Sequence, residues 1–275
     1  MRAFNAEWVK LARPTTLFGF GGTMIGFTLL FTILIFESAG GRNLELDGSG
    51  SEMFVTAAML SLPEGSVLVV TDMAVFYGIV ALALFASNLA GEFNKGTIRM
   101  LFVTEPNRLK VLSGKLLALA TFTAAAVAAT LAISIAAGAL IATNVGVGTA
   151  AWWTTDGLMA IGAAFLNITA GALVPALIGA TIAVLTRSTT IAISVGLGWF
   201  ILAEALIGAF WDGLSRWGPA AVSTALAAGG SGGIGVIDGA TPTISYATAI
   251  LLAIGYSALA LTITSAVLTR RDITS

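Results

Sequence analysis

Long apolar stretches with almost no charged side chain dominate this sequence. Of its 275 residues, 57% are hydrophobic and only 10% are charged, whereas soluble globular proteins carry about 25% charged residues. A helix needs roughly 20 apolar residues to cross a bilayer. The sequence therefore predicts one all-α integral membrane domain, residues 1–275, with six transmembrane helices. These six stretches are Thr15–Phe36, Leu68–Ala90, Val111–Ala142, Gly157–Leu185, Thr189–Phe210 and Ile244–Leu268.

The basic residues predict the orientation of these helices. Of the 13 basic residues, 11 precede the first stretch, follow the last one, or lie in or near the second and fourth connections, and only Arg42 and Arg216 lie on the other side. Because cytoplasmic loops are enriched in Lys and Arg, we expect both termini in the cytoplasm and the chain in the cell membrane of a bacterium or archaeon. The net charge of −1 argues against a nucleic-acid partner.

The N-terminal segment, residues 1–14, has the pattern of an amphipathic helix. Its apolar face holds Phe4, Trp8 and Leu11. Its polar face holds Arg2, Glu7, Lys10 and Arg13. We expect an elbow helix in the inner membrane interface, with Trp8, Lys10 and Arg13 at its surface, and we expect Pro14 to end it.

Two segments on the predicted outer side, 37–67 and 211–243, are unusual. The first is acidic and Gly-rich, and the second contains Pro219–Ala228, an apolar run too short to cross a bilayer. This run predicts a re-entrant or interfacial helix between the fifth and sixth transmembrane helices. Trp152 and other tryptophans near the outer boundaries are expected to form an aromatic belt.

Three polar residues inside the apolar stretches are candidates for a transport pathway. Glu204 is the only acid deep within a stretch, and intramembrane acids are costly and usually functional. It is predicted either to bind cationic cargo or to form hydrogen bonds between helices. Asn88 and Asn167 suit hydrogen bonds between helices, whereas Gly22 and Gly26 suit close helix packing.

Most catalytic chemistry is excluded by composition. The chain has no Cys and no His, so thiol nucleophiles, Cys/His zinc sites and Ser-His-Asp triads are absent. Gly114-Lys115 lacks the rest of a P-loop, because Leu109 and Leu116 occupy two of its required positions. We expect a protein that is not an enzyme by itself, with no metal and no cofactor bound to this chain.

The connection at residues 91–106 has the features of a short helix beneath the membrane. Gly96 ends the preceding helix, Thr97 caps a new one, Arg99 gives it charge, and Pro106 stops it. Asn107 is placed to cap the next transmembrane helix. Such a helix can transmit force from a soluble partner to the helices on either side of it, although residues of this type also occur in ordinary basic loops.

This connection resembles that of ABC-2 type permeases, the membrane subunits of exporters with the type V fold. The resemblance is carried by Glu92, Lys95-Gly96-Thr97-x-Arg99, Pro106-x-Arg108 and Lys115, and it extends to the N-terminal segment with Glu7 and Lys10. It implies that the connection, with Glu105 included, is a coupling helix bound by two separate ATPase subunits. These subunits would hold ATP and Mg²⁺, and a second permease copy or a paralogue would complete the pathway.

Three functions are compatible with this pattern. The first is the permease of an ATP-driven exporter of hydrophobic or amphipathic cargo, such as a drug, antibiotic, lipid or peptide. The second is an ion-coupled secondary transporter that uses Glu204. The third is an immunity or sensing subunit that binds an antimicrobial compound at its outer loops.

Overall fold

The computed structural model describes residues 2–40, 55–94, 96, 107–204, 206, 210–211, 216–229 and 244–270. Every regular element among these residues is a helix. The elements are α1 (Arg2–Leu11), α2 (Pro14–Thr16), the π-helix η1 (Leu17–Gly21), α3 (Gly22–Ala39), α4 (Ala57–Leu60), η2 (Pro63–Ser66), α5 (Leu68–Asp72), α6 (Ala74–Asn94), α8 (Arg108–Ala142), η3 (Ala150–Trp153), α9 (Thr155–Thr186), α10 (Thr189–Leu197), the π-helix η4 (Gly198–Ala203), α13 (Pro219–Ala227) and α14 (Tyr246–Arg270).

Five helices among the described residues are long and apolar enough to span a membrane. They are Pro14–Ala39, Ala74–Asn94, Arg108–Ala142, Thr155–Thr186 and Tyr246–Thr269. The fifth predicted stretch forms α10 and then η4, and its remaining residues are described only in part. The chain is therefore an all-helical membrane protein in which five spans are found, while the count of six stays a prediction.

Two helix boundaries differ from the predicted ones. The predicted stretch Leu68–Ala90 is divided at Met73 into the short helix α5 and the long helix α6. The N-terminal helix ends at Leu11, slightly earlier than predicted, and Arg13 has the extended backbone (φ −69°, ψ 144°) expected before a proline, so that Pro14 begins the new helix α2. Proline suits this first position, since its missing N–H has no partner there in any helix.

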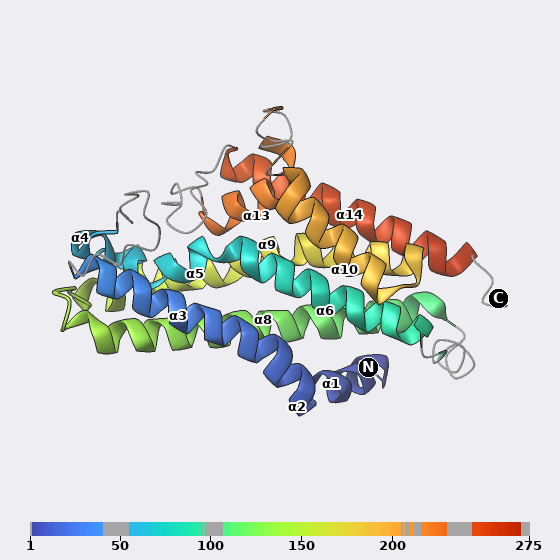
Figure 1. Cartoon of the computed structure of the whole chain (residues 1–275), viewed down its shortest axis with the longest axis horizontal. Coiled ribbons are helices and arrows are strands. Elements are labelled where there is room, and N and C mark those ends of the chain that lie inside the picture. Colours follow the sequence, from blue (N-terminus) through green and yellow to red (C-terminus); the bar gives the residue numbers. More distant parts are fainter. Residues whose placement is uncertain are drawn as a thin grey trace.

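The long helices run side by side and bring the start of α1 and the end of α14 to one end of the bundle (Figure 1). The same end holds the last turn of α6, the first turn of α8 and the turn between α9 and α10. We call this the basic end, because it carries Lys10, Arg108, Lys110, Lys115 and Arg187. α4, η2 and η3 lie at the opposite end.

The helices α6 and α9 form the centre of the bundle, whereas α14 is the least enclosed of the long helices. Small residues let the central helices approach closely. A Cβ atom added at Gly179 of α9 would lie 2.8 Å from Leu82 Cγ and 2.9 Å from the Leu82 carbonyl oxygen. The prediction of close packing at Gly22 and Gly26 is wrong within this chain, because a Cβ atom at either position meets nothing within 4 Å.

The opposite end is closed by a small apolar cluster around Trp152. The indole N–H of Trp152 donates to the Leu60 carbonyl at 2.8 Å, and its ring meets Phe36 edge-on at a centroid distance of 6.1 Å. Trp152 is fully buried, together with Leu60 and Val55. The expectation that Trp152 belongs to an aromatic belt is therefore wrong, because this ring fills the core of the cap.

The packing of α6 on α9 predicts that Gly179→Ala destabilises the protein by about 1–3 kcal/mol, since the new methyl group overlaps a backbone oxygen that cannot rotate away. Thermal unfolding of the purified protein in detergent measures this effect. Gly26→Ala is the matched control and should leave the melting temperature unchanged or raise it, because Ala favours a helix. Equal melting temperatures for the two variants would contradict the packing described here.

Candidate functional site

Four charged side chains from three helices meet at the basic end. The Lys115 ammonium of α8 lies 2.6 Å from Glu92 Oε1 of α6 and 2.9 Å from Glu7 Oε2 of α1. The Lys10 ammonium lies 2.8 Å from Glu7 Oε1 and 3.2 Å from Glu92 Oε1. Each lysine thus contacts both carboxylates. We call this group the four-charge cluster.

Burial makes the four-charge cluster energetically important. Only 5% of the side-chain surface of Lys115 and of Glu7 is exposed, and 13% of that of Glu92. An isolated charge in such a place carries a desolvation penalty of several kcal/mol. The two positive and two negative charges compensate one another, so the cluster is neutral as a unit. Removal of any one member leaves an uncompensated buried charge.

The Glu7 carboxyl shows this balance directly. Burial alone raises the pKa of Glu7, but the Lys115 charge and the hydrogen bond from Lys10 outweigh that effect, so the pKa is lowered below its ordinary 4.5. Burial likewise acts to lower the pKa of Lys10, and its hydrogen bond to Glu7 raises it above 10.5. Both shifts favour the charged forms over the neutral ones.

The position of Glu7 corrects the predicted polar face of the N-terminal helix. Phe4, Trp8 and Leu11 do form one face, and Trp8 meets Phe122 of α8 at a centroid distance of 6.1 Å. Glu7 lies within the same stripe, because it is three residues after Phe4 and four before Leu11. The apolar face of α1 is thus packed on α8, and Glu7 is carried inward with it.

The structure describes only part of the predicted coupling connection. Gly96 has a φ of +67° just after α6 ends, in agreement with its predicted role as a helix stop. Asn107 caps α8 as predicted, since its side chain accepts from the Lys110 N–H at 3.1 Å. Arg108 donates to the Leu268 carbonyl of α14 at 2.8 Å. The other predicted residues lie outside the described residues: Lys95, Thr97, Arg99, Glu105 and Pro106.

Glu204, the predicted pathway acid, is a hydrogen-bond acceptor for the first turn of α13. Its two oxygens lie 2.9 and 3.2 Å from the Ala220 backbone nitrogen, and the Trp199 indole N–H donates to it at 3.1 Å. The first N–H groups of a helix have no partner within the helix, and a carboxylate there also suits the helix dipole. Of the two predicted roles, the structure thus provides the hydrogen bonds between helices.

Asn167, the second pathway candidate, lies at the other end of α13. Its Oδ1 accepts from the Tyr246 hydroxyl of α14 at 2.6 Å. Gly229, which follows α13 with a φ of +60°, approaches so closely that an added Cβ atom would lie 3.0 Å from Asn167 Nδ2. Asn88 does not join this group, and its buried Oδ1 has no hydrogen-bond partner among the described residues.

α13 is held between these two residues against the middle of the bundle. The Ser223 hydroxyl donates to the Gly171 carbonyl at 2.9 Å, and Gly171 lies halfway along α9. Val222, Ala225 and Leu226 form an apolar cluster with Ala249 of α14. This short helix therefore packs against both α9 and α14, and its predicted character as a re-entrant or interfacial helix stays a prediction.

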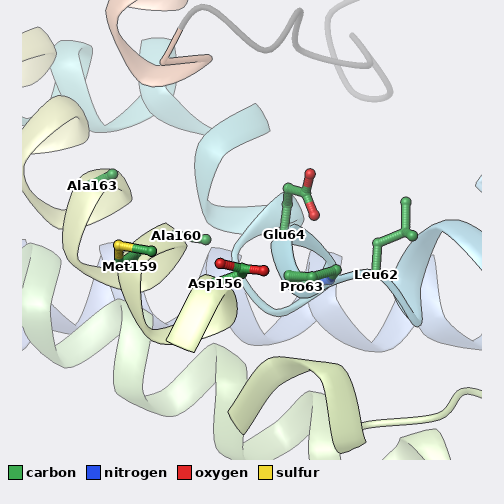
Figure 2. Close-up of a pocket in the computed structure, with 7 residues that line it drawn as sticks. All are labelled: Leu62, Pro63, Glu64, Asp156, Met159, Ala160 and Ala163. Atoms are coloured by element: carbon green, nitrogen blue, oxygen red, sulfur yellow. The ribbon is translucent and has the colours of Figure 1, made fainter. Parts of the chain in front are cut away.

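A pocket of about 520 Å³ lies at the opposite end, between η2 and the start of α9. Figure 2 shows the carboxylates of Glu64 and Asp156 beside Pro63 and Met159 in this pocket. Each acid lies in the first turn of its helix, where a negative charge offsets the helix dipole. Among the described residues, no group of three or more His, Cys, Asp or Glu is arranged to hold a metal ion.

A protein-family model matches most of this chain. Residues 27–274 match the model of a family described as a protein of unknown function, DUF2705. Because the match covers most of the chain, the chain belongs to this family. No curated protein sequence matches it.

The cluster geometry predicts that Lys115→Met destabilises the protein by about 3–5 kcal/mol, because it leaves Glu7 and Glu92 buried with too little positive charge. Thermal or denaturant unfolding in detergent measures the loss. Arg13→Met removes a positive charge from an exposed position and should change stability by about 0.5 kcal/mol or less. Similar losses in both variants would contradict a special role for Lys115.

Stability should also depend on the protonation of Glu7. A lowered pKa means that the contribution of Glu7 is complete above its ordinary 4.5 and is lost as the pH falls through the lower value of the folded state. We expect the melting temperature of the wild type to fall more steeply between pH 6 and pH 3 than that of Glu7→Gln. Parallel curves would show that Glu7 gains no stabilisation from its neighbours.

Glu204→Gln should loosen α13, because an amide oxygen can accept backbone hydrogen bonds but the amide nitrogen cannot. The chain has no Cys, so a single Ser223→Cys substitution reports the accessibility of α13 to a maleimide. We expect labelling at this buried position to be several-fold faster in the Glu204→Gln background. Glu64→Gln, at an exposed acid, should leave the labelling rate unchanged, and an unchanged rate with Glu204→Gln would refute the proposed contact.

Proposed function

We propose that this member of the DUF2705 family is the permease subunit of an ATP-driven exporter of the ABC-2 type. In this proposal the chain has six spans, with both termini in the cytoplasm. It forms the pathway with a second copy of itself or a paralogue. Two separate ATPase subunits hold ATP and Mg²⁺ and bind the connection between α6 and α8.

The four-charge cluster is the observation that carries this proposal. Glu92 is two residues before the end of α6, and Lys115 is two turns into α8. Because α6 continues to Asn94, the first residues of the predicted 91–106 connection belong to that helix. Glu92 and Lys115 therefore join the two helices close to where the rest of the connection begins and ends, and Glu7 and Lys10 add α1 to the same unit. A force applied to the connection would move all three helices together, which a flexible basic loop would not achieve.

The mechanism follows from this arrangement. ATP binding draws the two ATPase subunits together and displaces the connection, so that α1, α6 and α8 tilt as one body. The tight packing of α6 on α9 passes the movement to the centre of the bundle. α13 lies against α9 and α14, so the same movement alters the space around it. Export then requires that cargo binds more tightly in the inward-open state than in the outward-open state.

The structure offers less support for a carrier driven by an ion gradient through Glu204. The oxygens of this carboxylate already accept from Trp199 and from the backbone of α13. An acid that shuttles ions must instead be reachable from each side in turn. Glu204 is therefore assigned to holding α13, and the proposed cargo remains hydrophobic or amphipathic, in keeping with the low charge of the helices.

The proposal is tested by looking for an ABC ATPase reading frame beside the gene of this chain and by co-purifying its product with this chain. We expect a stable complex whose ATP hydrolysis rises when a hydrophobic cargo is added. Arg99→Ala, which removes the predicted charge of the coupling helix, should weaken the complex roughly tenfold without changing the melting temperature of the permease. Arg216→Ala, on the predicted outer side, should bind normally. A wild-type chain that transports cargo alone, driven by a pH gradient, would overturn the proposal in favour of the secondary transporter.

A further inference from the structure

Arg187 has an unusual backbone conformation at the basic end. It follows α9 with φ 54° and ψ 21°, and it is the only non-glycine residue with a positive φ among those described. Residues other than glycine rarely adopt this left-handed backbone conformation. The position after a helix that has this conformation is usually filled by Gly or Asn. Backbone outliers of this kind occur where a particular side chain is needed at the site.

The Arg187 side chain is held over the end of α6. Its guanidinium lies 5.8 Å from the centre of the Phe93 ring, in a cation–π contact. One residue further on, Asn94 Nδ2 lies 3.3 Å from Thr189 Oγ1. The turn between α9 and α10 is thus fixed at two points to the last turn of α6, next to the connection that follows. The Arg187 backbone N–H donates to the Ala183 carbonyl at 2.9 Å, but within the part of the chain that the structure describes its side chain makes no hydrogen bond and no ion pair.

The charges around Arg187 favour an anionic partner. Among the described residues, the acids at the basic end are Glu7 and Glu92, and both are paired with lysines in the four-charge cluster. Arg108 donates to the Leu268 carbonyl. The Arg187 guanidinium therefore keeps its donors available for a carboxylate, which it can bind with two parallel hydrogen bonds.

The position of Arg187 favours a protein partner over a lipid headgroup. It lies where α9 ends and above the last turn of α6, and these two helices are the most enclosed of the long helices. Their ends therefore lie near the middle of the basic end. Headgroups of the surrounding bilayer gather at the rim of a helix bundle, whereas a soluble subunit docked beneath it reaches the middle.

We propose that Arg187 is a second docking point for the soluble ATPase subunit, and that it binds a carboxylate on the surface of that subunit. This inference rests on the proposed function. It adds a contact from the α9–α10 turn to the one expected from the 91–106 connection. Because Phe93 and Asn94 join this turn to α6, both contacts belong to one rigid part of the permease.

The test compares Arg187→Asn with the wild type in the full-length protein. Asn tolerates a left-handed backbone but lacks the charge, so the variant should keep or raise the melting temperature. We expect its affinity for the ATPase subunit to fall about tenfold, the loss typical of one charge-assisted bidentate contact. The affinity of Arg187→Lys should lie between those of the wild type and Arg187→Asn, because lysine keeps the positive charge but lacks the planar guanidinium that forms two parallel hydrogen bonds. Arg216→Asn is the matched control and should bind like the wild type.

The binding is measured in vesicles of phosphatidylcholine alone and in vesicles that also contain phosphatidylglycerol. The same loss in both supports the inference, whereas a loss seen only with the anionic lipid assigns Arg187 to a headgroup and overturns it. Unchanged affinity of Arg187→Asn, or a lower melting temperature that accounts for the loss, also overturns it and leaves the proposed function intact. A wild-type chain that does not bind the ATPase subunit overturns both.

Discussion

The contact of the Lys115 ammonium with two carboxylates is the interaction on which the basic end of this protein depends. It joins α1 to α6 and α8, which come much later in the sequence, through a single buried positive charge. Lys10 supplies the second positive charge and makes the group neutral. A buried charge is tolerated only when it is paired and hydrogen-bonded, so the three helices hold one another in a fixed relation. That relation makes the two ends of the 91–106 connection a single mechanical unit.

Glu204, a buried acid outside the four-charge cluster, is stabilised differently. Glu204 contacts no lysine or arginine among the described residues, and its partners are the first turn of α13 and the Trp199 indole. Asn167 contacts the residues beyond the other end of the same helix. α13 therefore keeps its place through hydrogen bonds at its first turn and from the Ser223 hydroxyl in its middle, and through the close approach of Gly229 to Asn167 beyond its other end. Such contacts are directional, so a small tilt of α9 or α14 would alter them more sharply than it would alter apolar packing.

The sequence was sufficient to predict features that depend on neighbouring residues. Apolar length set the third stretch at Val111–Ala142, and the observed helix differs from it by three residues at one end. Asn107 was identified as a cap because capping involves residues three apart. The burial of Glu7 was missed, although its spacing from Phe4 and Leu11 placed it on the apolar face. Lys115 carried a similar signal, as a charge near the start of an apolar stretch.

Features that depend on the rotation and height of separate helices lay beyond sequence reasoning. Lys10 and Glu92 are 82 residues apart, and nothing local shows that their helices face each other. The contact of Glu204 with Ala220 spans only 16 residues, but it requires that α13 folds back into the bundle. Trp152 was assigned to the aromatic belt because it lies near a predicted outer boundary, and only the cap around Leu60 reveals its burial.

A double-mutant cycle between Glu7 and Lys115 tests the central claim most directly. The stability of the wild type, Glu7→Gln, Lys115→Met and the double variant is measured in one detergent under one set of conditions. If the two side chains share a buried ion pair, the double variant will lose at least about 1 kcal/mol less than the sum of the two single losses. Additive losses, within about 0.3–0.5 kcal/mol, would show that the pair does not join α1 to α8. The mechanical unit described here would then not exist.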